Sequence, residues 1–494
     1  MGKSIIVIGA GMGGLASGIY GQVNGYDTRI FEMHNQPGGQ CTSWKRKSYT
    51  FDGCIHHLLG CSSFSKIYEL WSELGAMPRE QVYTRECVSV VSPEGKMFND
   101  YWDPDELESH LKELAPRDAK VIEDYIKGIK VFAEEDFMGR AIYGTKIDML
   151  KAAVKMLPAR KLLTPTMEKY AAKFTDPFLR RAFPLLEYSI TEMPFMLHAA
   201  KHAYGYRGDI AWPVGGALEF SRSIAERYEE LGGEVNYKSR VERILTEGDR
   251  AVGVKLEDGS EHKADMVISN ADGRKSILGM LEGRYIDAKI KEWCEEPDDE
   301  TPFAVMVFLG IDRDLSREPS ALVMLLDKPV EIAGHFTDSL EIQTYGFDKT
   351  MAPEGKGVIK VELYSSYRYW KALHEDKDRY EEEKSKVADT VIDLLEGYFT
   401  GIKGQVEVVD VATILTWERY MGGTHGFSNM PNKKMNIAAS LFGKGVATLP
   451  GLSGFYLVGQ WATQAGALPA NAGSGRDTIE AICKRDGKRF ATTP

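Results

Sequence analysis

The 494-residue sequence predicts an α/β fold organised around a parallel sheet. Residues 5–8 form a short apolar run, which is typical of a strand buried on both faces. Leu15, Ile19 and Val23 then recur every four residues, as on the buried face of a helix. A second strand is predicted over residues 28–31, and strand–helix–strand units build parallel sheets.

A glycine-rich turn joins the first strand to the helix in the spacing G-x-G-x-x-G. Gly9 permits the tight turn, Gly11 lets a pyrophosphate approach the backbone, and Gly14 lets helix and strand pack closely. The start of the helix offers free N–H groups to the phosphates. Glu32 ends the second strand, where its carboxylate can accept hydrogen bonds from a ribose. The pattern predicts a Rossmann-like nucleotide site. A glycine-rich turn that binds no ligand would not need an acidic residue such as Glu32 at the end of the next strand.

Composition excludes several classes of protein. With 43% hydrophobic and 27% charged residues the chain is globular, and its length predicts two or more lobes. The net charge of −11 argues against a nucleic-acid partner. Six cysteines without a C-x-x-C pair make no disulfide framework, and the first strand leaves no room for a signal peptide. We therefore expect a cytoplasmic protein without a membrane-spanning helix.

Cys54, His56, His57 and Cys61 lie within eight residues of one another. Their spacing, C-x-H-H-x-x-x-C, matches no common zinc pattern, so we predict no metal site.

Residues 140–181 form a basic segment inside this acidic protein, with ten Lys or Arg and three Asp or Glu. Four apolar residues fall on one helical stripe: Ile147, Leu150, Val154 and Leu157. A basic amphipathic helix of this kind can lie on an anionic membrane surface, here the inner face of the membrane. The alternative is that its apolar stripe packs on the protein's own domain.

The second half of the chain alternates short strands and turns. Strands are predicted at residues 234–237, 241–245, 251–256, 263–269, 303–310 and 357–364. Near the C-terminus a strand ends at Gly459, a loop of small residues covers 466–475, and a helix is predicted over 476–484.

NAD and FAD share the first fingerprint, and three features favour FAD. A second glycine pair, Gly38-Gly39, lies where a longer cofactor would extend. The strands at 241–269 precede no second G-x-G-x-x-G unit. A glycine-rich helix start also closes the chain, where it could receive the flavin edge or the second phosphate.

Together these residues resemble the flavin amine oxidase and phytoene desaturase superfamily, within it the phytoene desaturase, carotenoid isomerase and retinol saturase branch. The resemblance is densest at residues 4–60, 213–272 and 454–482. It implies a discontinuous Rossmann-like FAD-binding lobe, made of residues 1–75, 205–290 and 436–494. Residues 76–204 and 291–435 would form an α+β substrate lobe and a helical cap.

The resemblance also implies cofactor contacts. Gln40 replaces the arginine that follows the second glycine pair in the family, and Gln460 replaces a common acidic residue after Gly459. Asp52 belongs to a segment that passes beside the flavin, and Val241 offers backbone groups to adenine. The implied FAD contacts are Gly9, Gly11, Gly14, Glu32, Gly38, Gly39, Gln40, Asp52, Val241, Gly459 and Gln460.

The implied function is FAD-dependent redox chemistry on a hydrophobic polyene, isoprenoid or lipid, by desaturation, saturation or isomerisation of C=C bonds. The family pattern places His56, His57 and His425 near the flavin, as proton donors or acceptors or as structural histidines. Amine oxidation is an alternative on the same fold. A non-catalytic prenyl-protein carrier, like the Rab GDP-dissociation inhibitors, is an alternative of another class, against which the complete G-x-G-x-x-G and Glu32 argue.

Overall fold

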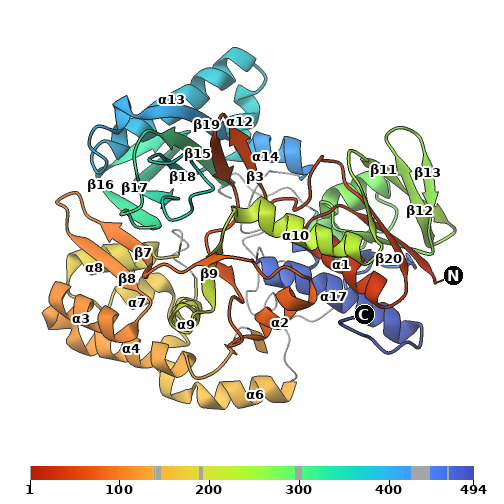
Figure 1. Cartoon of the computed structure of the whole chain (residues 1–494), viewed down its shortest axis with the longest axis horizontal. Coiled ribbons are helices and arrows are strands. Elements are labelled where there is room, and N and C mark those ends of the chain that lie inside the picture. Colours follow the sequence, from red (N-terminus) through yellow and green to blue (C-terminus); the bar gives the residue numbers. More distant parts are fainter. Residues whose placement is uncertain are drawn as a thin grey trace.

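The structure is a computed structural model that describes residues 2–137, 139–140, 146–187, 193–294, 303–423, 446–463 and 467–494. One lobe, on the right in Figure 1, is built on a parallel sheet. This sheet has five strands among the described residues, in the order β10-β2-β1-β14-β20. The strands are β1 (Ser4–Ile8), β2 (Asp27–Phe31), β10 (Glu234–Asn236), β14 (Met266–Ser269) and β20 (Phe455–Leu457). Every neighbouring pair runs parallel, although the strands come from distant parts of the chain.

Both faces of the parallel sheet are buried, which explains its continuous apolar strands. Ile5 and Val7 face a core shared with helices, and Ile6 and Ile8 face a core shared with an antiparallel meander. The helices are α1 (Met12–Val23), α10 (Gly216–Glu230) and α17 (Leu468–Arg485). The meander consists of β11 (Val241–Glu247), β12 (Arg250–Leu256) and β13 (Glu261–Lys263), whose hairpins the sequence predicted.

The prediction of a loop over 466–475 is wrong for its larger part, because α17 begins at Leu468. The small residues serve close packing of α17 against α1. A Cβ atom on Gly475 would lie 2.5 Å from the carbonyl oxygen of Gly13 and 2.8 Å from the amide nitrogen of Ser17. The glycine therefore permits helix contact.

The second lobe is built on a larger mixed sheet, with seven strands among the described residues in the order β19-β15-β18-β17-β16-β7-β8. The strands are β7 (Glu86–Val91), β8 (Met97–Tyr101), β15 (Phe303–Ile311), β16 (Ala321–Ile332), β17 (His335–Thr344), β18 (Gly357–Ser365) and β19 (Val406–Ala412). The predicted strands at 303–310 and 357–364 are confirmed as the neighbours β15 and β18. Helices α12 (Tyr367–Leu373), α13 (Lys377–Leu395) and α14 (Ile414–Met421) contribute to the core on the outer face of this sheet.

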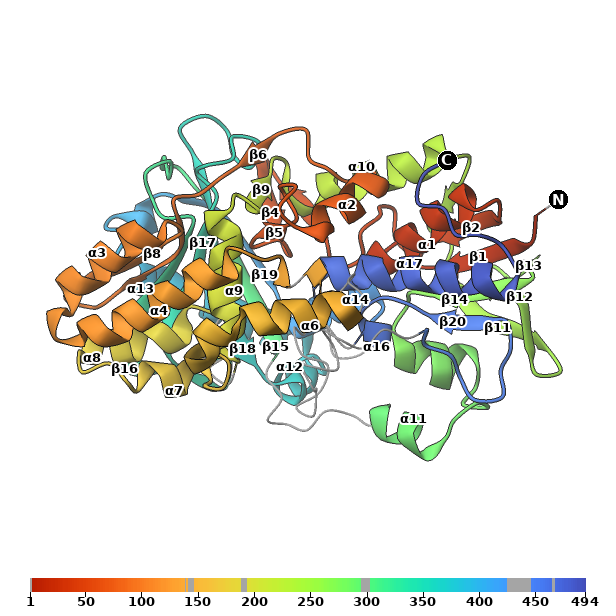
Figure 2. The ribbon, with the colours of Figure 1, turned by 90° about the horizontal axis from the view of Figure 1, so that it is seen from below.

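A helical cap extends from the mixed sheet (Figure 2). It contains α3 (Pro104–Leu114), α4 (Ala119–Phe132), α6 (Lys146–Lys155), α7 (Met167–Ala171), α8 (Pro177–Ala182) and α9 (Phe195–Tyr206). Within the described part of the chain, no helix is long and apolar enough to cross a bilayer.

The remaining strands, helices and turns are short. They are β3 (Ser43–Arg46), β4 (Tyr49–Asp52), β5 (Leu58–Leu59), β6 (Gln81–Val82), β9 (Ile210–Pro213), α2 (Lys66–Glu73), α11 (Ala288–Trp293), α16 (Gln460–Thr463), the 3-10 turns Pro116–Asp118, Leu157–Leu162, Phe183–Leu185 and Ile402–Gly404, and the π-helix Lys275–Met280. The parallel-sheet strands lie within the segments assigned to the FAD lobe. The domain boundaries themselves stay a prediction.

Candidate dinucleotide site and buried histidine cavity

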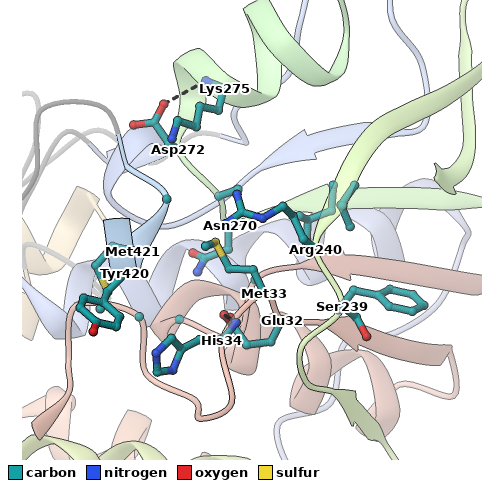
Figure 3. A pocket seen from close by; sticks show the side chains of 18 of the residues that line it. Glu32, Met33, His34, Ser239, Arg240, Asn270, Asp272, Lys275, Tyr420 and Met421 are labelled. Atoms are coloured by element: carbon teal, nitrogen blue, oxygen red, sulfur yellow. Dashed lines mark hydrogen bonds between the residues drawn. The ribbon is translucent and has the colours of Figure 1, made fainter. Parts of the chain in front are cut away.

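A cavity opens at the carboxyl ends of the parallel strands (Figure 3), the usual place for a ligand in such sheets. The ends of β1, β2 and β14 and the start of β11 form its walls. Residues that line it include Gly9, Gly11, Glu32, Gly39, Ser239, Arg240, Val241, Asn270, Lys275 and Tyr420.

The glycine turn places the start of α1 at this cavity. Gly9 has φ of +92° and donates its N–H to the carbonyl oxygen of Phe31 at 2.8 Å. A Cβ atom on Gly14 would lie 2.0 Å from the Gly9 carbonyl oxygen, so only glycine permits this helix approach. Gly11 is the N-terminal cap of α1, and the first turn carries no acidic residue. The free N–H groups of the helix are therefore available to an anion.

Glu32 presents a carboxylate to the same cavity. The residue is 7% exposed, and its Oε2 and Oε1 accept the N–H groups of Ala10 at 2.7 Å and His34 at 2.8 Å. Burial raises the pKa of Glu32, and these two hydrogen bonds oppose that shift. Each carboxylate oxygen keeps a second acceptor position, which suits the two hydroxyls of a ribose.

The other predicted contacts divide into two groups. Gly39 and Val241 line the cavity. Gly38 instead shapes the turn beside it, with φ of +108° and its N–H donated to the Ala10 carbonyl at 2.8 Å. Gly459 donates its N–H to Ser474 Oγ at 2.8 Å. Gln40 is half-buried beyond the turn, and Gln460 begins α16.

Asn270 is a site residue that the sequence reading missed. A Cβ atom on Gly11 would lie 2.4 Å from Asn270 Nδ2, and one on Gly459 would lie 2.3 Å from Asn270 Oδ1. The amide thus fills the space between two glycine turns from opposite ends of the chain. Its position directly after β14, at the carboxyl edge of the sheet, is the signal that could have found it.

Asp52 is held inside the protein by four donors among the described residues. The carboxylate accepts the N–H groups of Cys54, Ile55 and Ala217, the last at 2.6 Å, and the hydroxyl of Ser43 at 3.2 Å. Burial raises its pKa, and the hydrogen bonds oppose that shift. Asp52 therefore fixes the segment 52–55 to the start of α10.

His56 and His57 lie in a different place, between the mixed sheet and the cap. Burial lowers the pKa of His56 to about 4, helped by the charge of Lys360, and it lowers that of His57 to about 3. Both rings are therefore uncharged at pH 7. Cys87 Sγ lies 3.9 Å from His57 Nε2. No group of metal-ligating side chains is found among the described residues, and His425 lies outside them.

The family model described as flavin containing amine oxidoreductase matches residues 12–476 of this chain. A phytoene desaturase (lycopene-forming) from a Paracoccus species is 30% identical over 287 residues, which cover 56% of each protein. The chloroplastic prolycopene isomerase of Daucus carota is 26% identical over 442 residues, covering 85% of this chain and 71% of that relative. A solved oxidoreductase from Methanosarcina mazei shares the fold, with a TM-score of 0.60, 19% identity and coverage of 97% of this chain and 100% of that chain.

The chain thus spans little more than half the length of the Paracoccus relative. The described cavity fits the dinucleotide part of FAD. Its glycine turns form part of the cavity wall, the start of α1 is available to phosphate, and Glu32 can accept ribose hydroxyls.

Gly11→Ala is expected to weaken FAD binding by roughly tenfold or more, the factor that 1.4 kcal/mol represents. The added methyl would lie 2.4 Å from Asn270 Nδ2 and would displace this side chain at the cavity wall. Bound flavin is measured by absorbance after equilibrium dialysis. Gly404→Ala is the matched control, because its methyl meets nothing within 4 Å. Equal flavin affinity in the two folded variants would contradict this role of Gly11.

Proposed function

Because this chain belongs to the flavin containing amine oxidoreductase family, we propose that it is an FAD-dependent oxidoreductase of an apolar polyene or isoprenoid. The reaction is desaturation, saturation or isomerisation of C=C bonds. FAD, when bound, supplies a reversible acceptor of two electrons.

The protein's own groups hold the cofactor. The start of α1 and the backbone at Gly11 and Gly39 would bind the diphosphate, Glu32 would bind the ribose, and Val241 would offer its backbone to the adenine. Asp52 positions the following segment, which carries His56 and His57 into the second cavity.

The observation that carries the substrate class is the apolar side of that second cavity. Its lining includes the aliphatic residues Val88, Leu185, Leu186, Leu322 and Ile342. Aliphatic walls select apolar ligands, and two relatives are named for carotenoid desaturation and isomerisation. His56 and His57 are uncharged, so neither ring must lose the water around a charge when the cavity fills.

The purified protein is expected to be yellow, and a polyene or isoprenoid should change its flavin redox state under anaerobic conditions. Absorbance near the flavin maximum is followed against a panel of polyenes, lipids and primary amines, with the flavin both oxidised and chemically reduced. Product analysis detects isomerisation. If only the amines reduce the flavin, the protein is an amine oxidase and the proposal is wrong. A folded, colourless protein that takes up no FAD would favour the carrier alternative.

We extend the proposal to a peripheral contact with an anionic membrane through the basic segment 140–181. The apolar stripe does not pack on its own domain, because Ile147 and Leu150 of α6 are 66% and 68% exposed. Val154 and Leu157 are each 58% exposed. They belong to α6 and the turn that follows it, at the outer edge of the cap (Figure 1), and Lys151 of α6 is exposed as well. An apolar stripe with neighbouring cations is the pattern of a helix that lies in a lipid interface.

Binding to anionic liposomes is expected to exceed binding to neutral ones and to fall with salt, since each basic residue near the surface contributes about 1 kcal/mol. The double variant Leu150→Glu/Val154→Glu should lose most of this binding in a flotation assay. Phe336→Glu is the matched control, since Phe336 is a 67% exposed apolar side chain of the mixed sheet. Equal loss in both variants, or equal binding to both kinds of liposome, would refute the contact.

A further inference from the structure

The inner face of the mixed sheet carries a polar cluster that the proposed reaction does not use. Strand pairing places Glu341 opposite Glu362, and Gln343 opposite Lys360, on β17 and β18. All four side chains are buried, Lys360 at 1% and Glu362 at 3% exposure. Alternating charged and apolar residues are normally found where one face of a sheet meets water. Here the segment carrying His56 covers that face.

The ionic pairing of Glu362 is loose. Lys360 donates to His56 Nε2 at 3.2 Å, and its Nζ lies 3.9 Å from Glu362 Oε2. His56 Nε2 lies 3.4 Å from the same carboxylate oxygen. Neither oxygen of Glu362 accepts a hydrogen bond from any described residue. A buried carboxylate without a well-placed donor is costly, so the site calls for a donor closer than those that the described residues supply.

The cluster forms one wall of the histidine cavity. Glu341, Lys360 and Glu362 lie on the polar wall, and aliphatic side chains such as Leu185 and Leu186 lie on another part of the lining. The enclosed space is about 20 Å³, enough for a water molecule or one polar ligand group. The lining is amphipathic, and a space of this size takes a single polar group at the end of an apolar ligand.

Donor and acceptor chemistry selects the terminus. Lys360 can only donate hydrogen bonds, and the ionised Glu362 can only accept them. A ligand carboxylate would be repelled by Glu362, and a ligand ammonium would be repelled by Lys360. A hydroxyl can accept from Lys360 and donate to Glu362 at the same time. Because His56 is uncharged, it adds no second cation to this arrangement.

We propose that Lys360 and Glu362, with His56, form a binding site for a hydroxyl group at one end of the apolar substrate. This inference rests on the proposed function, since it names the substrate as an isoprenoid or polyene alcohol. Lys360 and Glu362 are specificity residues here, and the bond chemistry takes place elsewhere on the substrate.

The test compares a C20 isoprenoid alcohol with its methyl ether and with the hydrocarbon of the same skeleton. Dissociation constants for the FAD-loaded protein are measured by quenching of tryptophan fluorescence, which needs no turnover. The wild type is expected to bind the alcohol at least roughly tenfold more tightly than the other two ligands, or 1.4 kcal/mol. Equal affinity for the three ligands would overturn the hydroxyl site, because the cavity would then hold water only.

Two variants locate the preference. Lys360→Met/Glu362→Leu removes the whole pair, and proteins often tolerate the replacement of a buried ion pair by apolar side chains. It should bind alcohol and hydrocarbon equally. Glu362→Gln should reduce the preference for the alcohol over the hydrocarbon at least threefold. This single variant tests the assignment if the double variant does not fold. The control Glu354→Gln changes an exposed carboxylate before β18 and should keep the full preference.

A preference that persists in the folded pair variant, or that Glu362→Gln leaves unchanged, would overturn the assignment to these residues. The failure of the proposed function is distinct. In that case none of the three ligands would bind, and none would change the flavin redox state, whereas failure of this inference alone leaves hydrocarbon binding intact.

Discussion

The close approach of α1 to the turn after β1 is the constraint on which the site depends. A Cβ atom on Gly14 would lie 2.0 Å from the carbonyl oxygen of Gly9, so a side chain there would push the helix away from the strand. With glycine the helix start, the Glu32 carboxylate and the Asn270 amide meet at one edge of the parallel sheet. Gly475 provides the corresponding close approach between α17 and α1, so both ends of the chain support the same cavity.

A small set of buried acids couples this cavity to the mixed sheet. Asp52 joins its own segment to the start of α10 through Ala217. Asp348, between β17 and β18, accepts the indole N–H of Trp212 and the backbone N–H of Gly215, both next to α10. The Asp52 bonds hold the segment that leads to His56 and His57, which lie between the mixed sheet and the cap. In the function that we propose, cofactor binding and substrate binding therefore share one stretch of backbone, residues 38–57.

Sequence predicted the local parts of this arrangement well. The strand, glycine turn and helix at residues 4–32 are specified by neighbouring residues, so they could be read directly. Contacts between distant segments could not. Nothing in residues 357–365 says that the polar face of β18, with Lys360 and Glu362, is buried, because alternation predicts a water-facing side. The small residues before Arg476 suggested a loop because their helical role depends on α1. Asn270 needed the sheet order to be found.

A crystal structure of the FAD-loaded protein would test the central claim most directly, because it locates the cofactor relative to the glycine turn. We expect the diphosphate at the start of α1, with a ribose hydroxyl within about 3 Å of a Glu32 carboxylate oxygen. FAD bound elsewhere in the fold, or bound with Glu32 remote from both ribose hydroxyls, would contradict the account.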